Sequence, residues 1–351
     1  MKILFIGLGS IGQRHLRNII QLLPTLPEIL AVRRIKKVPF LNEKMEINGT
    51  TEDLINKYNI LEFENIDLAL NNNPDLVYIT NPSIFHITNA KLAMKNNCSI
   101  FIEKPLSSNW EGVEDLLNTN SKNKNRTLIG YQFRFHPAMK EIKSILEKKL
   151  IGNLVSANFV NGEYLPFWHP YEDYRQSYAA RNDLGGGALV TQIHEFDLAA
   201  WFFGPPESIY AVGGKLSDLD INVEDSVIIL MRYLYNSSSI PVSIQLDYLR
   251  YPSERSVSIV GDRGTIYWNS ECNDLIVTDN KRLTKNIFSY LNFSRNKMFI
   301  DLTKHFLEVN SGSISPIVSI KEAAISLKMA LAAKHSILAR CEVNYKEFKP
   351  Y

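Results

Sequence analysis

Short apolar runs alternate with helical stretches over residues 1 to about 125 of the chain. The short runs predict strands, and the segments between them place apolar residues at helical spacing. Strands that alternate with helices are typical of parallel βαβ units, so this half predicts a doubly wound sheet. The predicted strands are Lys2–Ile6, Glu28–Arg33, Leu76–Thr80 and Ser99–Glu103, and the predicted helices are Ile11–Leu23, Ile66–Asn72 and Phe85–Asn96.

Later apolar runs follow one another with little helix between them, which predicts a mostly antiparallel sheet. The fold class is therefore α/β, with a Rossmann domain over residues 1–125 and an α/β domain for substrate binding and oligomerisation over residues 126–351. The later strands are predicted at Leu154–Tyr164, Ser208–Gly213, Ser226–Tyr233, Val242–Tyr248 and Ser256–Val260, with a turn at 261–264 and helices at Ala188–Phe203, Lys297–Val309 and Ser319–Leu338.

The composition of the chain argues against nucleic acid or a membrane as its partner. Lysine plus arginine (39) nearly balance aspartate plus glutamate (37), and a formal charge of +2 is too small for the basic field of a nucleic-acid-binding protein. No stretch reaches the about 20 apolar residues of a membrane span. The three cysteines form no paired spacing and are expected to be reduced in a cytoplasmic protein. A small molecule is the expected partner, and the broad sheet predicts a homodimer or homotetramer.

A glycine-rich turn links the first predicted strand to the first predicted helix. The sequence Gly7-Leu-Gly9-Ser10-Ile11-Gly12 fits G-x-G-x-x-G in the strand-to-helix context that gives this pattern its meaning. The first glycine permits the tight turn, the second lets backbone approach a pyrophosphate, and the third lets helix pack on strand. The alternative is a glycine-rich turn without a ligand. We expect a dinucleotide whose phosphates face the helix start.

The end of the second predicted strand carries basic residues where an NAD enzyme usually carries a carboxylate. Arg33 and Arg34 stand there, followed by Lys36 and Lys37. A guanidinium pairs bidentately with a 2′-phosphate, so the sequence favours NADP as cofactor, with NAD as the alternative. The alternative is that these basic residues only form a solvent-exposed strand end and bind no phosphate.

An ionisable pair, Glu103 and Lys104, stands at the end of the strand Ser99–Glu103 and is followed by Pro105. The carboxyl ends of parallel strands border the crevice where doubly wound folds bind ligands. An ammonium there can donate to a reacting oxygen, and burial lowers its pKa. A salt bridge with a neighbouring carboxylate is the alternative role of Lys104.

Five motifs in this order resemble the glucose-fructose oxidoreductase, inositol dehydrogenase and rhizopine-catabolism (Gfo/Idh/MocA) family over nearly the whole chain. They are Gly7–Gly12, Thr80-Asn81-Pro82 with His86, Glu103-Lys104-Pro105, 130–137 and 185–197. The resemblance implies a nicotinamide domain, a substrate domain, and hydride transfer at a ring carbon of a sugar, cyclitol or polyol. It also implies that Lys104 contacts substrate and nicotinamide ribose. The predicted cofactor-binding residues are Gly7, Gly9, Ser10, Ile11, Gly12, Arg33, Arg34, Asn81, Pro82, His86, Glu103 and Lys104.

A predicted helix after the three glycines 185–187 carries a second candidate catalytic residue. His194 lies on it with Thr191 and Asp197 at a spacing of three, which places all three on one face. A histidine titrates near neutrality and can shuttle the proton of a substrate hydroxyl. A satisfied core histidine is the alternative, and the family resemblance favours catalysis. Many relatives have an aspartate three or four residues before the histidine, where this chain has Thr191 or Val190. The relay must therefore use His194 with Lys104, a tyrosine or water.

The segment 163–181 collects aromatic and basic residues with little periodicity. Aromatic faces stack on sugar rings and arginines clamp anionic groups, so we expect a carbohydrate that carries a phosphate or carboxylate. An aromatic loop packed over the sheet or at a subunit interface is the alternative. No metal site is predicted, because the histidines lie in separate segments. The predicted substrate-binding residues are Tyr131, Arg134, Trp168, Tyr174, Arg175, Arg181, Thr191 and His194.

These features predict a cytoplasmic NAD(P)-dependent dehydrogenase or reductase that acts on CH–OH groups of a sugar, nucleotide sugar or polyol, in unusual-sugar or surface-glycan synthesis. Two alternatives stay open. Thr191 in place of aspartate favours a non-catalytic module that binds NADP and a sugar. A reductase of a non-carbohydrate substrate is the other, although an apolar substrate would leave the arginines of the segment 163–181 unpaired.

Overall fold

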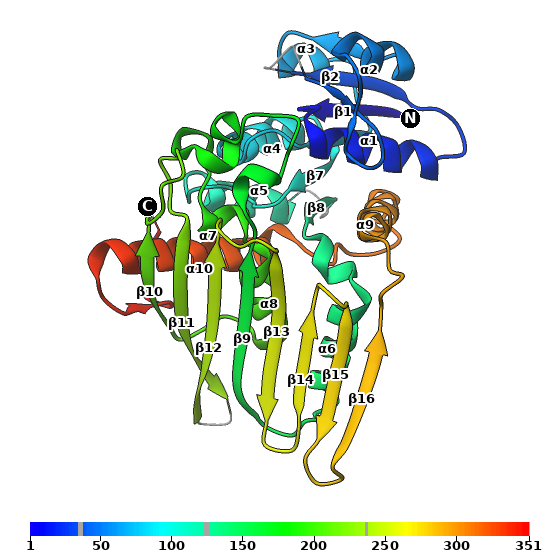
Figure 1. The fold of residues 1–351 in the computed structure, drawn as a ribbon. Coiled ribbons are helices and arrows are strands. Elements are labelled where there is room, and N and C mark those ends of the chain that lie inside the picture. Colours follow the sequence, from blue (N-terminus) through cyan, green and yellow to red (C-terminus); the bar gives the residue numbers. More distant parts are fainter. Residues whose placement is uncertain (34–37, 123–125, 236–237, 351) are drawn as a thin grey trace. The chain divides into compact units, whose positions relative to one another are not determined.

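The computed structural model describes residues 1–33, 38–122, 126–235 and 238–350 (Figure 1). The chain forms two compact units, and each is composed of two stretches of sequence. The first unit contains Met1–Tyr131 and Asn296–Ala324, and the second contains Gln132–Arg295 and Ile325–Tyr351.

The first unit is built on a six-stranded sheet in which every neighbouring pair is parallel. Its central strands are buried on both faces, as their continuous apolar runs predict. The order reverses direction between β1 and β6, and this switch point is where doubly wound sheets bind ligands. The order is β5 (Leu61–Phe63), β2 (Glu28–Val32), β1 (Lys2–Ile6), β6 (Leu76–Ile79), β7 (Ser99–Glu103) and β8 (Thr127–Gly130).

Helices connect these strands, and two of them begin at side-chain caps. In the helix α2, for example, Thr50 and Asp53 form a reciprocal capping box. A two-stranded hairpin, β3 (Phe40–Leu41) with β4 (Ile47–Gly49), lies between β2 and α2. The helices are α1 (Ser10–Leu22), α2 (Thr51–Tyr58), α3 (Ile66–Leu70), α4 (His86–Lys95) and α5 (Val113–Lys122).

The late helix α9 (Arg295–Asn310) belongs to the first unit from Asn296 onward, although it follows the strands of the second unit in sequence. Phe306 is fully buried, and its ring centroid lies 5.4 Å from that of Tyr78 and 5.7 Å from that of Phe101. These aromatic contacts with β6 and β7 explain why the grouping differs from the division at residue 125 made on sequence alone.

The second unit is built on a nine-stranded sheet that is antiparallel except for the pair β9–β12. The predicted mostly antiparallel sheet is thus confirmed, as is the turn at 261–264, where Gly261 N donates to Gly264 O. The order is β16 (Thr284–Ser289), β15 (Asp274–Asp279), β14 (Thr265–Asn269), β13 (Glu254–Gly261), β9 (Leu154–Gly162), β12 (Ser238–Asp247), β11 (Ser226–Tyr235), β10 (Ser208–Gly214) and β17 (Val343–Asn344).

Helices cover one face of this sheet, as Figure 1 shows for α6 (Pro137–Glu147), α8 (His194–Phe203) and α10 (Ile320–Ala339). The single helix predicted over Ala188–Phe203 is wrong. A short helix α7 (Ala188–Thr191) ends before α8, because Gln192 leaves helical geometry and its side chain donates to Asp247 O at 2.9 Å. No helix among the described residues is long and apolar enough to cross a membrane.

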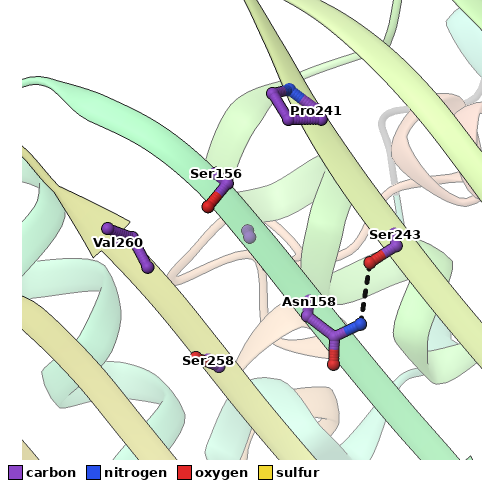
Figure 2. Close-up of a pocket in the computed structure, with 7 residues that line it drawn as sticks. Ser156, Asn158, Pro241, Ser243, Ser258 and Val260 are labelled. Carbon is purple, nitrogen blue, oxygen red and sulfur yellow. Dashed lines mark hydrogen bonds between the residues drawn. The ribbon is translucent and has the colours of Figure 1, made fainter.

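The opposite face of the large sheet exposes apolar side chains around an uncharged centre. A depression of about 180 Å³ lies at this centre. Asn158 donates a hydrogen bond to Ser243 there, at 2.7 Å (Figure 2). Aligned positions on the flanking strands expose large apolar side chains, for example Leu230, which is paired in register with Tyr210 and Ser243. The exposed apolar residues on these strands include Tyr210, Val212, Ile228, Leu230, Leu234 and Tyr267.

Candidate active site

The glycine-rich turn follows β1 at the switch point of the first sheet. Gly7 has φ +97°, and a Cβ on it would lie 2.9 Å from Asn81 N in the segment that follows β6. A Cβ on Gly12 would lie 2.5 Å from Gly7 O. Both positions therefore exclude any larger residue. Thr80 Oγ1 also donates to Gly7 O at 2.7 Å, which holds the two strand ends together.

Gly9 faces open space in this turn, because a Cβ there would meet no atom within 4 Å. Gly9 is also the N-cap of α1, whose first turn has no side-chain cap and no acidic residue. Uncapped amides at a helix start attract an anion, and the open space admits one. The geometry therefore fits the diphosphate of a dinucleotide. Ser10 and Ile11 in the same turn are half-buried.

The segment after β6 is held by His86, which is 1% exposed. His86 Nε2 lies 2.8 Å from Asn81 O, and His86 Nδ1 lies 2.8 Å from Pro105 O. His86 therefore joins the segments that follow β6 and β7, and we expect it to shape the cofactor site rather than to touch the cofactor. Asn81 Oδ1 is buried without a hydrogen-bond partner among the described residues, and it could accept a bond from a ligand. The adjacent Pro82 is half-buried.

Glu103 and Lys104 end β7 beside this segment. Glu103 is 6% exposed, its Oε1 lies 2.7 Å from His15 Nε2, and its Oε2 accepts a bond from Lys104 N at 3.0 Å. A Cβ on Gly130 would lie 3.2 Å from Glu103 Oε1, so the glycine leaves space for the carboxylate. Lys104 is half-buried and precedes a cis peptide bond to Pro105. The strand end thus carries a lysine directly after a carboxylate whose two oxygens each have a hydrogen-bond partner.

The basic end of β2 carries its own carboxylate partner. Arg33 is 6% exposed, and its Nε and Nη2 atoms lie 2.7 and 2.5 Å from Glu62 Oε1 on β5. The Arg33 charge is therefore already balanced within the first unit. Arg34, Lys36 and Lys37 lie outside the described residues.

In the second unit, Thr191 forms hydrogen bonds at the end of α7. Its Oγ1 donates to Gly187 O at 2.8 Å and lies 2.5 Å from the hydroxyl of Tyr248, which also donates to Ala179 O at 3.3 Å. Burial raises the pKa of Tyr248 well above its usual value, so this hydroxyl stays protonated. Neither Thr191 nor Tyr248 can serve as a general base near neutral pH.

His194 begins α8 and is buried, with 4% of its surface exposed. The ring of Phe133 lies 5.1 Å from that of His194, and the guanidinium of Arg255 lies 4.0 Å above the same Phe133 ring. Arg255 in turn binds Glu195 Oε1 at 2.7 Å. The predicted alignment of Thr191, His194 and Asp197 on one helix is not formed, because the chain breaks helix between α7 and α8.

The predicted substrate arginines each bind an aspartate of the second unit. Arg134 is 3% exposed and binds both oxygens of Asp197, at 2.8 and 3.0 Å. Arg175 and Arg181 bind Asp173 and Asp183, at 2.7 and 2.6 Å, in exposed pairs close in sequence. A substrate anion would have to displace or share these carboxylates. Arg134 and Asp197 in particular form a structural ion pair, since both side chains are buried.

The aromatic residues predicted to bind substrate lie in different surroundings. The indole of Trp168 packs edge-on against Tyr248 at 5.2 Å, and its Nε1 is buried without a hydrogen-bond acceptor in the described part of the chain. Trp168 is therefore the strongest of these candidates for a ligand contact. Tyr174 accepts a bond from Asp220 N at 3.2 Å, and Tyr131, in the first unit, is fully buried.

Two family models match the chain. Residues 1–131 match an oxidoreductase family with an NAD-binding Rossmann fold, and residues 139–267 match the GFO/IDH/MocA C-terminal domain. The chain belongs to the Gfo/Idh/MocA oxidoreductase family. The family resemblance predicted from the five motifs is thus confirmed, and so is the α/β fold class.

Relatives of this Gfo/Idh/MocA chain match it over its whole length. A myo-inositol 2-dehydrogenase of Thermotoga maritima is 24% identical over 99% of both chains. Levoglucosan dehydrogenase, solved with NADH and levoglucosan, has a TM-score of 0.80 at 17% identity and covers 99% of this chain and all of its own. The WlbA dehydrogenase of Bordetella pertussis, solved with NADH and UDP-GlcNAcA, has a TM-score of 0.77 at 18% identity and covers 98% of each chain.

The three glycines 185–187 do not leave a free helix start in this family member. Glu224 O accepts a bond from Ala188 N at 3.0 Å, and Glu224 Oε1 accepts one from Leu189 N at 3.1 Å. These amides at the start of α7 are therefore not open to an anion, because the backbone carbonyl and the carboxylate of Glu224 already accept their hydrogen bonds. Burial raises the pKa of Glu224.

Sequence reasoning missed three residues of the candidate site: His15, Glu62 and Tyr248. Each is a polar partner of a predicted residue, but lies far from it in sequence. His15 left a weak signal, because it stands among the apolar positions of the first helix together with Leu16 and Ile19, where a polar residue needs a partner. No comparable signal marked Glu62 or Tyr248.

His136 of the motif 130–137 is a buried N-cap. Its Nδ1 accepts a bond from Ala138 N at 3.2 Å, and its ring packs against Trp268 and Phe293 at 5.2 and 5.0 Å. Burial, aided by the charge of Arg255, lowers the pKa of His136 to about 4. The neutral ring is therefore the form that the fold stabilises.

We predict that His136→Asn reduces the loss in free energy of unfolding that occurs between pH 7 and pH 4. The native pKa of about 4 lies below the usual value of 6.5, so the stability contributed by neutral His136 is present above pH 6.5 and is lost as the pH falls through 4. The loss amounts to about 3 kcal/mol. Asparagine also caps helices but does not titrate. Urea unfolding at pH 7 and pH 4 measures the difference, and equal pH dependence in both proteins would contradict the role.

Proposed function

We propose that this chain is an NAD(P)-dependent dehydrogenase or reductase that transfers hydride to or from a ring carbon of a sugar, nucleotide sugar or related polyol. The observation that carries the proposal is the open, uncapped start of α1 at Gly9, which suits a dinucleotide diphosphate. The myo-inositol, levoglucosan and UDP-sugar dehydrogenases among its relatives support the substrate class. A role in unusual-sugar or surface-glycan synthesis is the finer form of the proposal.

Lys104 has the role of polarising the reacting oxygen in this proposal. The nicotinamide, when bound, accepts or supplies the hydride. The Lys104 ammonium donates a hydrogen bond to the substrate oxygen and to the nicotinamide ribose, which stabilises negative charge that develops as the proton leaves. The carboxylate of Glu103 beside it is held by His15 and by the Lys104 amide.

His194 takes the proton of the substrate hydroxyl in the oxidative direction. Its imidazole is the suitable acceptor in the second unit, because the pair Thr191–Tyr248 is neutral and Tyr248 holds its proton. Trp168 Nε1 would donate to a hydroxyl of the substrate ring. Tyr131, Tyr174, Arg175 and Arg181 remain proposed substrate contacts, while Arg134 would act through its pair with Asp197.

The same neutral pair favours a second candidate function. A chain without the expected aspartate can bind a dinucleotide and a sugar and yet transfer no hydride. The Thr191 hydroxyl is engaged by Gly187 O and the Tyr248 hydroxyl, so the side chain at position 191 offers no general base. Turnover experiments decide between the two.

We predict that Lys104→Ala lowers turnover by roughly 100-fold or more, the range for loss of a general acid–base group, while NADH binding stays measurable. The assay follows NAD⁺ and NADP⁺ reduction with myo-inositol and a panel of cyclic polyols and sugars. Lys91→Ala, in an exposed pair with Asp115, is the control. Unchanged turnover in Lys104→Ala removes the catalytic role. A protein that binds NADH but turns over no member of the panel is the non-catalytic module.

We predict tighter binding of NADPH than of NADH, through Arg33. Because Glu62 neutralises this guanidinium, Glu62→Gln should widen the preference by roughly 10-fold, the factor for one charge-assisted hydrogen bond. Arg33→Ala should abolish the preference. Parallel fluorescence titrations with both cofactors measure it. Tighter binding of NADH by the unaltered protein would reject the 2′-phosphate argument.

We propose a second copy of the chain as the occupant of the exposed sheet face. The uncharged centre and the apolar rows of Tyr210, Ile228 and Leu230 suit packing against an identical sheet. The protein should sediment as a dimer or tetramer, and Leu230→Asp should yield particles of 40.1 kDa. Leu26→Asp, at an exposed position of the first unit, is the control. A 40.1 kDa species in the unaltered protein would contradict the interface.

A further inference from the structure

The carboxylate that follows His194 in sequence is held by two neighbouring strands of the large sheet. Glu195 is 2% exposed, and its Oε1 accepts a bond from Arg255 Nε at 2.7 Å, while its Oε2 accepts one from Asn161 Nδ2 at 3.3 Å. Arg255 on β13 and Asn161 on β9 stand opposite each other in register. A buried carboxylate needs such partners, so this pair fixes the first turn of α8, where His194 lies.

Arg255 makes a second contact, with an aromatic ring. Its guanidinium carbon lies 4.0 Å from the centroid of the Phe133 ring, within the range of a cation–π interaction. The Phe133 ring also contacts the imidazole of His194, with 5.1 Å between the centroids and 57° between the planes. Phe133 and His194 are both buried, and Phe133 lies in contact with the guanidinium and with the imidazole.

These contacts form a closed loop that includes the imidazole. From His194 the peptide chain leads to Glu195, the ion pair leads to Arg255, and Phe133 leads back to the His194 ring. One guanidinium is thus linked to the backbone of His194 through Glu195 and to its ring through Phe133. A proton acceptor needs such support, because a misplacement of about 1 Å can cost roughly 100-fold in rate.

We infer that Arg255 is a positioning residue for His194: it holds Phe133 against the imidazole while it anchors the first turn of α8 through Glu195. The inference rests on the proposed role of His194 as proton acceptor. It gives the ion pair of Arg255 and Glu195 a task beyond docking α8 onto the sheet. A pair that only docks the helix would stabilise the fold without restricting the motion of the imidazole ring, so ring mobility separates the two roles.

NMR relaxation of the imidazole, in the protein without cofactor or substrate, tests the inference. Histidine labelled with ¹³C at Cε1 gives a ring signal for each of the seven histidines. The His194 signal is the one that is missing from the spectrum of His194→Gln. Its relaxation gives the order parameter of the Cε1–H bond, which reports how far the ring is held in one orientation.

Arg255→Met removes the cation but keeps a long side chain. The order parameter of the His194 ring should fall from about 0.85, typical of rigid groups, to below about 0.6, typical of flexible ones. Arg255→Lys keeps a cation that can lie over Phe133, so it should restore about half of this loss or more. If Arg255→Met does not fold, Arg255→Gln replaces it, since it also loses the cation but keeps an N–H donor for Glu195.

The matched control is Lys143→Met, which acts at the other end of α8. Lys143 Nζ on α6 donates to Trp201 O at 2.8 Å, and its side chain is 25% exposed, against 17% for Arg255. The control therefore removes a partly buried cation that ties α8 to its surroundings, by the same kind of substitution. It should leave the order parameter of the His194 ring unchanged.

Phe133→Leu completes a double-mutant cycle. It removes the ring contact and leaves the ion pair of Arg255 in place, so it should loosen the His194 ring by itself. Because Arg255 acts on the imidazole through Phe133, Arg255→Met should have little further effect in the Phe133→Leu background. An unchanged order parameter in Arg255→Met, an equal fall in Lys143→Met, or additive falls in the double variant would overturn the inference.

The relaxation measurement needs neither cofactor nor substrate, so its outcome is separate from that of the turnover assays. A ring that loosens as expected, in a protein that turns over no polyol or sugar, would leave the inference standing and remove the proposed dehydrogenase activity. A ring that stays rigid in Arg255→Met, in a protein that is an active dehydrogenase, would do the reverse.

Discussion

The close approach of two chain segments at the switch point of the first sheet governs the rest of the candidate site. Gly7 and the segment at Asn81 approach so closely that a Cβ on Gly7 would lie 2.9 Å from Asn81 N. This contact lets the turn bend immediately after β1 and leaves Gly9 facing open space at the start of α1. From the same segment, Asn81 O reaches His86, whose other nitrogen reaches Pro105 O beside Lys104.

Several charged side chains of the second unit and of the Rossmann sheet form ion pairs within the protein, so their charges are already balanced without a ligand. Arg33 binds Glu62, Arg134 binds Asp197, and Arg255 binds Glu195. A buried charge without a partner costs several kcal/mol, so the fold supplies partners wherever burial demands them. A prediction from residue type alone therefore counts too many arginines as ligand contacts. The buried arginines named above instead bind carboxylates that stabilise the fold.

Much of the architecture follows from local pattern. The strand Lys2–Ile6 is apolar from Ile3 onward because both faces of the parallel sheet are covered there, and its observed bounds equal the predicted ones. Local pattern misled at Ala188–Phe203, since the break at Gln192 depends on a bond to Asp247, a residue distant in sequence. Local pattern also assigned α9 to the second domain. Its place in the first unit depends on contacts of Phe306 with Tyr78 and Phe101, which lie more than two hundred residues away in sequence.

In the candidate site, too, features set by local sequence could be predicted and features set by distant contacts could not. The glycine turn and the Glu103-Lys104-Pro105 strand end could be located because their chemistry is contiguous in sequence. Tyr248 beside Thr191 and His15 beside Glu103 could not, since a hydrogen-bond partner across the fold leaves no spacing to recognise. Their positions follow from tertiary packing alone.

The central claim, that the start of α1 holds the diphosphate of a dinucleotide, is tested most directly by NADH titration of Gly9→Asp. Gly9 has φ −67° and open space, so aspartate fits there and caps α1 without strain. Its carboxylate would occupy the amides that the diphosphate needs and repel the phosphates. The account predicts an unchanged or higher unfolding temperature together with a loss of NADH affinity of roughly 10-fold or more. Undiminished NADH binding by this variant would contradict it.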